Sequence, residues 1–207
     1  MAYVKAAERE EQIVAAAIRV LGAVGVAGTT LRAVATEAGL PLGTMHYVFP
    51  SKDKLLRAVI AAVERDVAAA LHVRVDSDHG VAQAIRQAVD NFWSSLVENE
   101  IGLQVMQYEL AMYSARDDGG AGGLGRLQFQ GYTALIAESY ERAATAAGER
   151  CAVDYDTLGR LSLAMMDGLI IQYVTNPDPE RARRDLDHAV DMIVRFADPR
   201  PIAAAAD

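Results

Sequence analysis

Hydrogen-bonding side chains gather on one short predicted helix within the segment Thr30–Leu56, and they belong to Thr44, His46 and Tyr47. Leu40, Met45 and Phe49 fall on the other side of this helix and are expected to bury against its neighbours. A hydroxyl, an imidazole and a phenol are therefore left projecting outward. Groups of this kind on one exposed face can recognise a partner through hydrogen bonds.

The surrounding residues predict the elements that must position this face. Thr30 can cap a first helix, and Gly39 ends it because glycine adopts a left-handed conformation without a steric penalty. Pro41 suits the first position of the next helix, and Ser51 caps the one after it. Two short helices joined by a glycine-containing turn make a helix-turn-helix, whose second helix enters the major groove of DNA.

This segment resembles the DNA-binding domain of the tetracycline-repressor (TetR) family of bacterial regulators. The residues that carry the resemblance are Thr30 through Gly39, Gly43 through Tyr47, and Phe49 through Leu56. The resemblance covers about the first 60 residues and implies that several side chains contact the DNA backbone or bases. The predicted DNA-binding residues are Thr30, Arg32, Thr44, His46, Tyr47 and Lys52. Position 46 is usually tyrosine in this family, so His46 leaves the operator sequence open.

Motifs of catalytic chemistry do not account for the chain. Helical carboxylate enzymes use a Glu-x-x-His pair, and the nearest approximations here start at Asp76 and Asp185. No Gly-x-Ser-x-Gly or His-Glu-x-x-His sequence is present, and Cys151 has no motif partner. The glycine-rich stretch Asp117–Gly125 lacks the strand and lysine of a phosphate-binding loop. We therefore expect a protein that is not an enzyme and carries neither metal nor cofactor.

Composition and charge suit a helical regulator. The 207 residues are 52% apolar, rich in alanine and poor in β-branched runs, which favours helices. The total charge of −8 divides unevenly, because residues 1–57 carry +2 and the remainder carries −10. The N-terminal part can therefore approach phosphate, whereas the rest repels it. The single cysteine and the absence of an apolar leader favour a cytoplasmic protein without a membrane span.

Helical periodicity predicts an all-α fold of about nine helices with no strand. Beyond the helix-turn-helix, the expected helices are Glu8–Val24, Ser51–Val73, Val81–Glu98, Ile101–Ala115, Leu124–Ala147, Tyr155–Val174 and Pro179–Phe196. The predicted domains are a DNA-binding domain over residues 1–50, a connecting helix over 51–75 and a ligand-binding and dimerisation domain over 76–198. Residues 199–207 are expected to be a disordered tail.

The resemblance also implies a ligand pocket and a homodimer. The predicted ligand-binding residues are Trp93, Met106, Tyr108, Glu109, Met112, Tyr113, Phe129, Tyr132, Met166 and Asp167. Each of them could instead fill the core, and the two acids could also pair with arginine or face water. The last two long helices are expected to form a four-helix bundle with a second copy, through Leu161, Ala164, Gly168, Ile171, Leu186, Val190 and Ile193.

The predicted function is a ligand-responsive regulator of transcription that binds double-stranded operator DNA as a homodimer. The effector is expected to be small and largely apolar, because the candidate lining is rich in aromatic and methionine side chains. Repression is the commoner mode in the resembling family, but the sequence does not separate it from activation. A metal enzyme and a protein-interaction bundle are the alternatives, and the second leaves Thr44, His46, Tyr47 and Lys52 unexplained.

Overall fold

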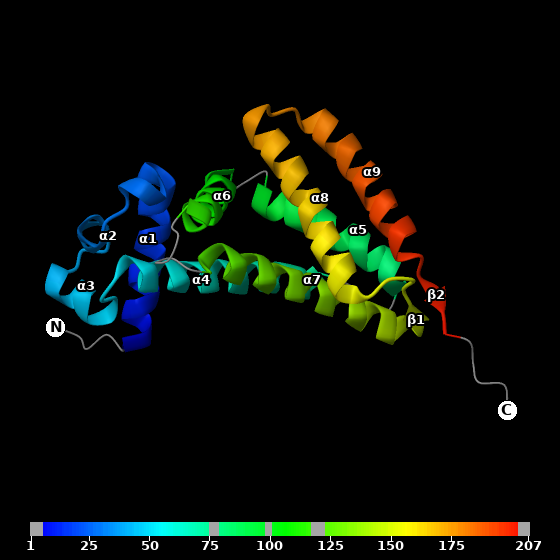
Figure 1. Cartoon of the computed structure of the whole chain (residues 1–207), viewed down its shortest axis with the longest axis horizontal. Helices are drawn as coiled ribbons and strands as arrows, with labels where there is room; N and C mark the ends of the chain where they lie inside the picture. Colours follow the sequence, from blue (N-terminus) through cyan, green and yellow to red (C-terminus); the bar gives the residue numbers. More distant parts are fainter. Residues whose placement is uncertain (1–5, 75–78, 98–100, 117–122, 203–207) are drawn as a thin grey trace. The chain divides into compact units, whose positions relative to one another are not determined.

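A computed structural model describes residues 6–74, 79–97, 101–116 and 123–202, and the structural statements below concern these residues. Nearly all of them lie in helices, which confirms the all-α prediction (Figure 1). The helices are α1 (Ala6–Gly28), α2 (Leu31–Glu37), α3 (Leu42–Val48), α4 (Lys52–Arg74), α5 (Gly80–Phe92), α6 (Ile101–Arg116), α7 (Leu124–Ala147), α8 (Tyr155–Thr175) and α9 (Pro179–Ala197).

Two compact units make up the chain. The first unit contains residues 1–66 and 102–128, and the second contains 67–101 and 129–207. Helices α4 and α7 each contribute to both units. The first unit thus joins α6 to the predicted helix-turn-helix, although these segments lie far apart in the sequence.

Helix α1 supplies much of the core of the first unit. Its buried residues Ile13, Ala17 and Leu21 recur at helical spacing, and the helix packs against α2. By length and composition α1 could also cross a membrane, but its buried stripe is the pattern of a core helix. Gly25 interrupts α1 with a φ of 69°, so the predicted end of this helix is a kink followed by one further turn to Gly28.

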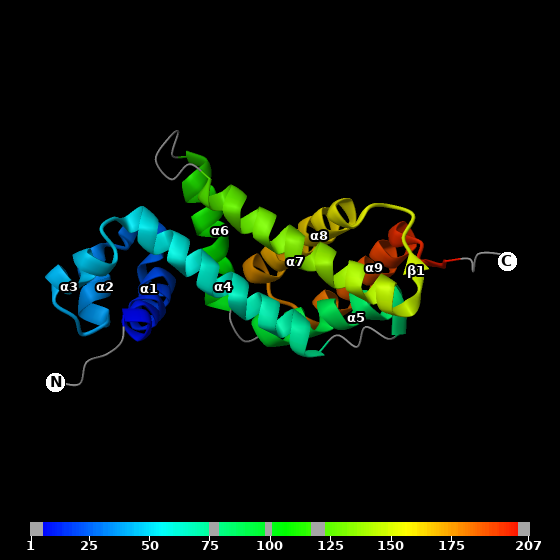
Figure 2. The same ribbon diagram turned by 90° about the horizontal axis from the view of Figure 1, so that it is seen from below.

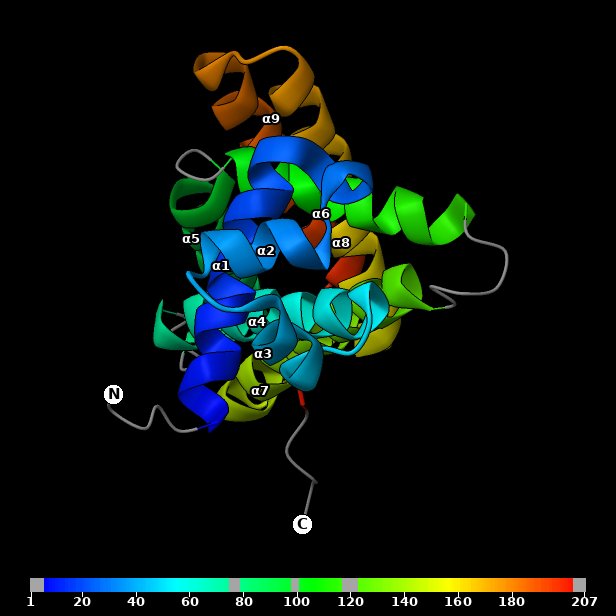
Figure 3. The same cartoon turned by 90° about the vertical axis from the view of Figure 1, so that its left-hand side faces the viewer.

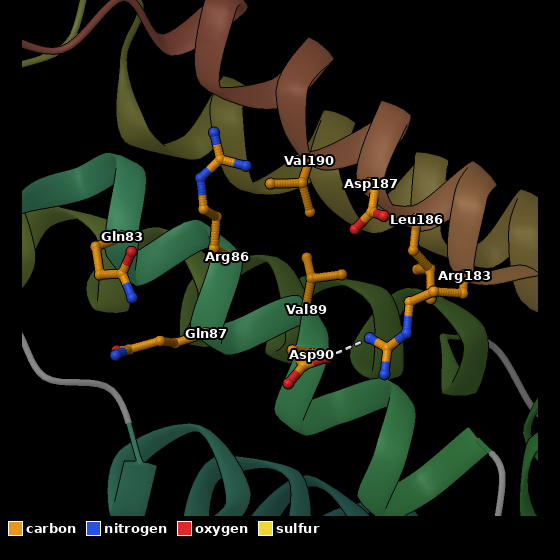
Figure 4. A pocket seen from close by; sticks show the side chains of 9 residues that line it. All are labelled: Gln83, Arg86, Gln87, Val89, Asp90, Arg183, Leu186, Asp187 and Val190. Carbon is orange, nitrogen blue, oxygen red and sulfur yellow. Dashed lines mark hydrogen bonds and ion pairs between the residues drawn. The ribbon is translucent and has the colours of Figure 1, made fainter.

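In the second unit, α9 packs against both α5 and α8 (Figures 1 and 2). Val89 of α5 and Leu186 and Val190 of α9 line a groove of about 280 Å³ between these helices (Figure 4). At this groove, Arg183 Nη1 of α9 donates a hydrogen bond to Asp90 Oδ1 of α5 at 2.5 Å. The groove therefore lies between two packed helices of one unit, which are joined by apolar side chains and by this ion pair.

Two short strands are a feature that the sequence did not predict. Strand β1 (Glu149–Arg150) pairs antiparallel with β2 (Arg200–Pro201), and Ile202 N–H donates to Gly148 O at 2.7 Å. Residues 200–202 of the predicted disordered tail are thus ordered against the α7–α8 connection, and residues 203–207 lie outside the described residues. A two-residue strand has no periodicity that a sequence pattern could reveal.

Other sequence predictions also need correction. The predicted helix 81–98 ends at Phe92 and continues as a π-helical turn, η2 (Trp93–Val97). Pro41 caps α3 instead of occupying its first position. Val105 and Met112 of α6 are exposed in the subunit although both are large and apolar. The first residues of the predicted ligand-binding and dimerisation domain, 76–78, lie outside the described residues.

Candidate nucleic-acid interface

The turn between α2 and α3 is built as the sequence predicted. Thr30 Oγ1 accepts a hydrogen bond from Ala33 N–H at 3.1 Å and so caps α2. Gly39 has a φ of 66°, and Leu40 N–H donates to Ala35 O at 2.9 Å. This 6→1 bond across a left-handed glycine is the Schellman geometry. The chain therefore turns within the four residues 38–41 and starts α3 beside α2 (Figure 3).

Helix α3 divides sharply between a buried and an exposed side. Met45 is fully buried, and Phe49 directly after the helix is buried with it. Tyr47 is 90% exposed, His46 is exposed, and Thr44 is half-buried. An aromatic side chain left this exposed on a well-packed short helix gains little from the fold. The arrangement suits contact with another molecule.

The first turn of α4 borders the same region. Ser51 Oγ accepts a hydrogen bond from Lys54 N–H at 3.2 Å, which confirms the predicted cap. Lys52 does not extend freely into solvent, because its Nζ donates to Val26 O at 2.5 Å and lies 5.3 Å from the centre of the Tyr113 ring. Burial lowers the pKa of the Lys52 ammonium from its ordinary value. Lys52 thus fastens α4 to the end of α1.

Helix α6 reaches the same kink of α1 from another direction. Glu109 Oε2 accepts a hydrogen bond from Val26 N–H at 3.1 Å. Gly25 makes this approach possible, since a Cβ there would lie 2.8 Å from Glu109 Oε2. Both polar backbone atoms of Val26 are therefore engaged, the N–H by Glu109 and the C=O by Lys52.

Comparison with known proteins now identifies the family. The family model named "Bacterial regulatory proteins, tetR family" matches residues 13–59. The model of the C-terminal domain of BetI-type transcriptional repressors matches residues 81–195. The chain belongs to the TetR family. It is accordingly a DNA-binding transcriptional regulator and not an enzyme.

Proteins similar to this chain in sequence are transcriptional regulators. A nicotine-responsive transcriptional repressor, HdnoR of Paenarthrobacter nicotinovorans, is 28% identical over 184 residues, which cover 89% of this chain and 93% of the relative. The regulator BetI of Burkholderia thailandensis is 33% identical over 108 residues, about half of each chain.

Solved TetR-type structures share the fold over nearly the whole chain. A transcriptional regulator from Rhodococcus sp. Rha1 has a TM-score of 0.74 at 22% identity, and the match covers 93% of this chain and 99% of that one. The multidrug-binding protein EbrR in complex with ethidium has a TM-score of 0.67 at 24% identity, covering 92% and 99%. At these identities the likeness shows the fold alone.

The predicted ligand-binding residues are divided between the two units. Met106, Tyr108, Glu109, Met112 and Tyr113 belong to the first unit, and Trp93, Phe129, Tyr132, Met166 and Asp167 belong to the second. Within the second unit, the rings of Trp93 and Tyr173 meet edge to face at 5.2 Å. The carboxylate of Glu109 accepts a hydrogen bond from the α1 backbone. A backbone partner for this acid was not predicted from the sequence.

The predicted dimer residues separate into exposed and buried groups. Leu161, Ala164, Gly168 and Ile171 are exposed along one side of α8. Leu186, Val190 and Ile193 are instead buried within the subunit. Leu186 and Val190 line the groove against α5, whereas Ile193 lines a groove on α8 and α9. The apolar stripe of α9 can pack against α5 of the same chain as readily as against a second copy, and the sequence pattern is the same in both cases. The exposed apolar residues of α9 are Met192 and Phe196.

Three buried polar residues and one long-range contact were not predicted from the sequence. Gln104, Gln107 and Gln128 are buried in the first unit, although glutamine on a helix usually faces water. Their only sequence signal is their position in helical phase with apolar neighbours such as Leu110 and Ala111. The contact between Glu109 and Val26 spans 83 residues and leaves no local signal.

Proposed function

We propose that this TetR-family regulator is a cytoplasmic homodimeric repressor that binds a palindromic operator and leaves it when a small, largely apolar effector binds. The observation that supports DNA recognition is the exposed pair His46 and Tyr47 on a helix anchored by Met45. Thr30, Arg32, Thr44 and Lys52 complete the proposed DNA surface. An α-helix fits the major groove of B-DNA, where exposed donors and acceptors can read base edges.

A homodimer is proposed from the apolar face of α8 and α9. Leu158, Leu161, Met165, Met192 and Phe196 line a groove of about 490 Å³ on these helices. Leu161, Met192 and Phe196 are exposed there although they are large and apolar. Covering this face with the same face of a second copy would bury all of them twice. Two recognition helices can then read half-sites about 34 to 36 Å apart.

The proposed effector class rests on the candidate lining and on the relatives. The relatives include a nicotine-responsive repressor and a protein solved with ethidium, and both compounds are nitrogen-containing ring systems. The aromatic candidates of the second unit, Trp93, Phe129 and Tyr132, suit a flat ring of that kind. We therefore propose an effector with an aromatic portion.

The contacts at Val26 suggest how α6 would communicate with the DNA-binding helices. Helix α6 carries Glu109, which binds Val26, and Tyr113, whose ring lies near the Lys52 ammonium. An effector that displaced α6 would have to break or carry along these contacts, and so would bias the placement of α1 and α4. The effector must bind the released state better than the DNA-competent one, by about 1 to 3 kcal/mol for a useful switch.

The experiment that tests this proposal is selection of genomic fragments by the purified protein at near-physiological salt, followed by sequencing. An enriched inverted repeat supports the dimeric operator-binding function. Absence of any enriched sequence, both with and without added cell extract, contradicts it. The extract arm separates a regulator that needs a ligand to bind DNA from a protein that does not bind a defined site.

Two substitutions then test the DNA surface on the selected operator. Tyr47→Ala should abolish operator binding while the melting temperature stays unchanged, because the side chain makes little contact within the subunit. Lys52→Met should weaken binding and lower the salt slope by about one unit if one of the ammonium's remaining donors reaches a phosphate. An unchanged slope together with a lower stability would restrict Lys52 to its contact with Val26.

A further inference from the structure

Three buried glutamines form a polar cluster inside the first unit. Gln104 and Gln128 are 3% exposed and Gln107 is 7% exposed. Gln104 and Gln107 lie one turn apart on α6, and Gln128 lies in the second turn of α7. Primary amides on helices are usually solvated, so three of them buried together require an explanation.

Close packing of α6 and α7 brings the cluster together. A Cβ at Gly125 would lie 3.4 Å from Ala111 O, and Gly125 N–H donates to Ser114 Oγ at 3.1 Å. Gln107 lies one turn before Ala111 in α6, and Gln128 lies one turn after Gly125 in α7, so the two side chains come together there. Glycine at position 125 therefore allows α6 and α7 to pack closely, and this packing brings the two amides together.

The hydrogen bonds inside the cluster leave one strong acceptor unused. Gln107 Nε2 donates to Gln104 Oε1 at 3.5 Å, and Gln128 Nε2 lies 3.5 Å from both the backbone and the side-chain oxygens of Gln107. All three distances lie at the long limit of a hydrogen bond. Gln128 Oε1 is buried and has no hydrogen-bond partner among the described residues. A buried carbonyl without a partner is costly to the fold, whereas leucine or methionine would pack there without that cost.

We propose that Gln128 Oε1 is the polar anchor of the effector and accepts a hydrogen bond from an N–H or O–H group of the ligand, with Gln107 and Gln104 holding the Gln128 amide in place. This assignment rests on the proposed function and adds the chemical class of its ligand. The three amides carry no formal charge, and the free atom is an acceptor. The cluster therefore selects an amine, ammonium or hydroxyl group on an apolar frame and disfavours a carboxylate.

Ethidium and its analogue without the two exocyclic amines, 5-ethyl-6-phenylphenanthridinium, form a matched pair of probes. The two dyes share ring system and charge and differ only in the N–H donors. Equilibrium binding to the purified full chain, followed by fluorescence in the absence of DNA, should show about tenfold tighter binding of ethidium, the size expected for one net hydrogen bond. Equal affinities, or no binding of ethidium, would overturn the assignment.

Variants of Gln128 locate the preference. Gln128→Met should reduce the affinity for ethidium to that of the analogue and leave the analogue unaffected, whereas Gln128→Glu keeps an acceptor and should retain the preference. Gln130→Leu changes an exposed glutamine on the same helix and should alter neither affinity. Tight binding of ethidium by Gln128→Met would refute the anchor.

Operator binding and thermal unfolding of the same variants keep the two proposals distinguishable. Gln128→Met should fold and bind the selected operator with wild-type affinity, but ethidium should no longer release it from the DNA. If wild-type protein selects no operator and still shows the dye preference, the proposed function fails and the anchor stands. If the operator is found and Gln128→Met responds to ethidium as the wild type does, only the anchor fails.

Discussion

The carboxylate of Glu109 accepts a hydrogen bond from the backbone N–H of Val26 at 3.1 Å, in the residue that follows the kink of α1. The second unit repeats this arrangement. Glu149 Oε2 accepts from Val81 N–H at 2.9 Å, directly after Gly80, whose φ is 82°. In both places a glycine with positive φ lets a distant glutamate reach the next backbone N–H, so a local irregularity becomes a tertiary contact.

Removal of the Glu109 carboxylate should destabilise the first unit. Glu109→Ala leaves Val26 N–H without its acceptor and should lower the free energy of unfolding by about 1 to 2 kcal/mol. Glu109→Gln retains an oxygen acceptor and should lose less. Urea unfolding followed by circular dichroism measures the difference. Glu138→Ala removes an exposed glutamate of α7 and should have no effect, and an equal loss in both alanine variants would argue against the contact.

Two glycines of α1 should respond in opposite directions to alanine. At Gly25 the backbone has a φ of 69° and a Cβ would lie 2.8 Å from Glu109 Oε2, so Gly25→Ala should destabilise by more than about 1 kcal/mol. At Gly22 a Cβ would meet nothing within 4 Å, so Gly22→Ala should stabilise the helix by about 0.5 to 1 kcal/mol. Thermal unfolding of the two variants side by side gives the signs.

A charge on the apolar face of α8 should prevent dimerisation. Leu161→Glu or Ile171→Glu would place a carboxylate in the proposed contact between copies, where burial without a partner is unfavourable. Sedimentation velocity should then show a folded monomer with weak operator binding. Val24→Glu is the matched control, since Val24 is also exposed, at 54%, but lies on α1. A dimer that persists in both α8 variants would place the interface elsewhere.

The half-buried carboxylate of Glu64 should make stability depend on pH. Burial raises the pKa of Glu64 above its ordinary value, and Oε1 has no partner among the described residues. The folded chain therefore binds a proton more readily than the unfolded chain, and the ionised group destabilises the fold above its folded pKa. As the pH falls through that pKa, Glu64 takes up a proton and the free energy of unfolding rises again.

Glu64→Gln should accordingly raise the free energy of unfolding at pH 7. The advantage should disappear below about pH 4, where the unfolded chain is protonated as well. Asp66→Asn, at an exposed position of the same helix, should show no such pH-dependent gain. Denaturant titrations of the three proteins at several pH values provide the comparison, and a gain for Glu64→Gln that is equal at every pH would contradict a titrating origin.

The amino-acid sequence determined every helix of the described chain to within a few residues, except where α5 passes into η2. Helical periodicity, the caps at Thr30 and Ser51, and the glycine at position 39 are local signals, because each depends on residues within one or two turns. They also fixed the exposed face of α3, and with it the family and the kind of partner. Local rules suffice where an element is stabilised mainly by its own residues.

Only the tertiary structure decided which distant segments meet. Leu186 and Val190 pack toward α5, and Glu109 binds the backbone of Val26. Strand β1 pairs with β2, and three glutamines are buried. A hydrophobic stripe shows that a helix side will be covered but not what covers it, since the free energy gained depends on area and not on the partner's identity. For the same reason, the buried amides became visible only when α7 was packed on α6.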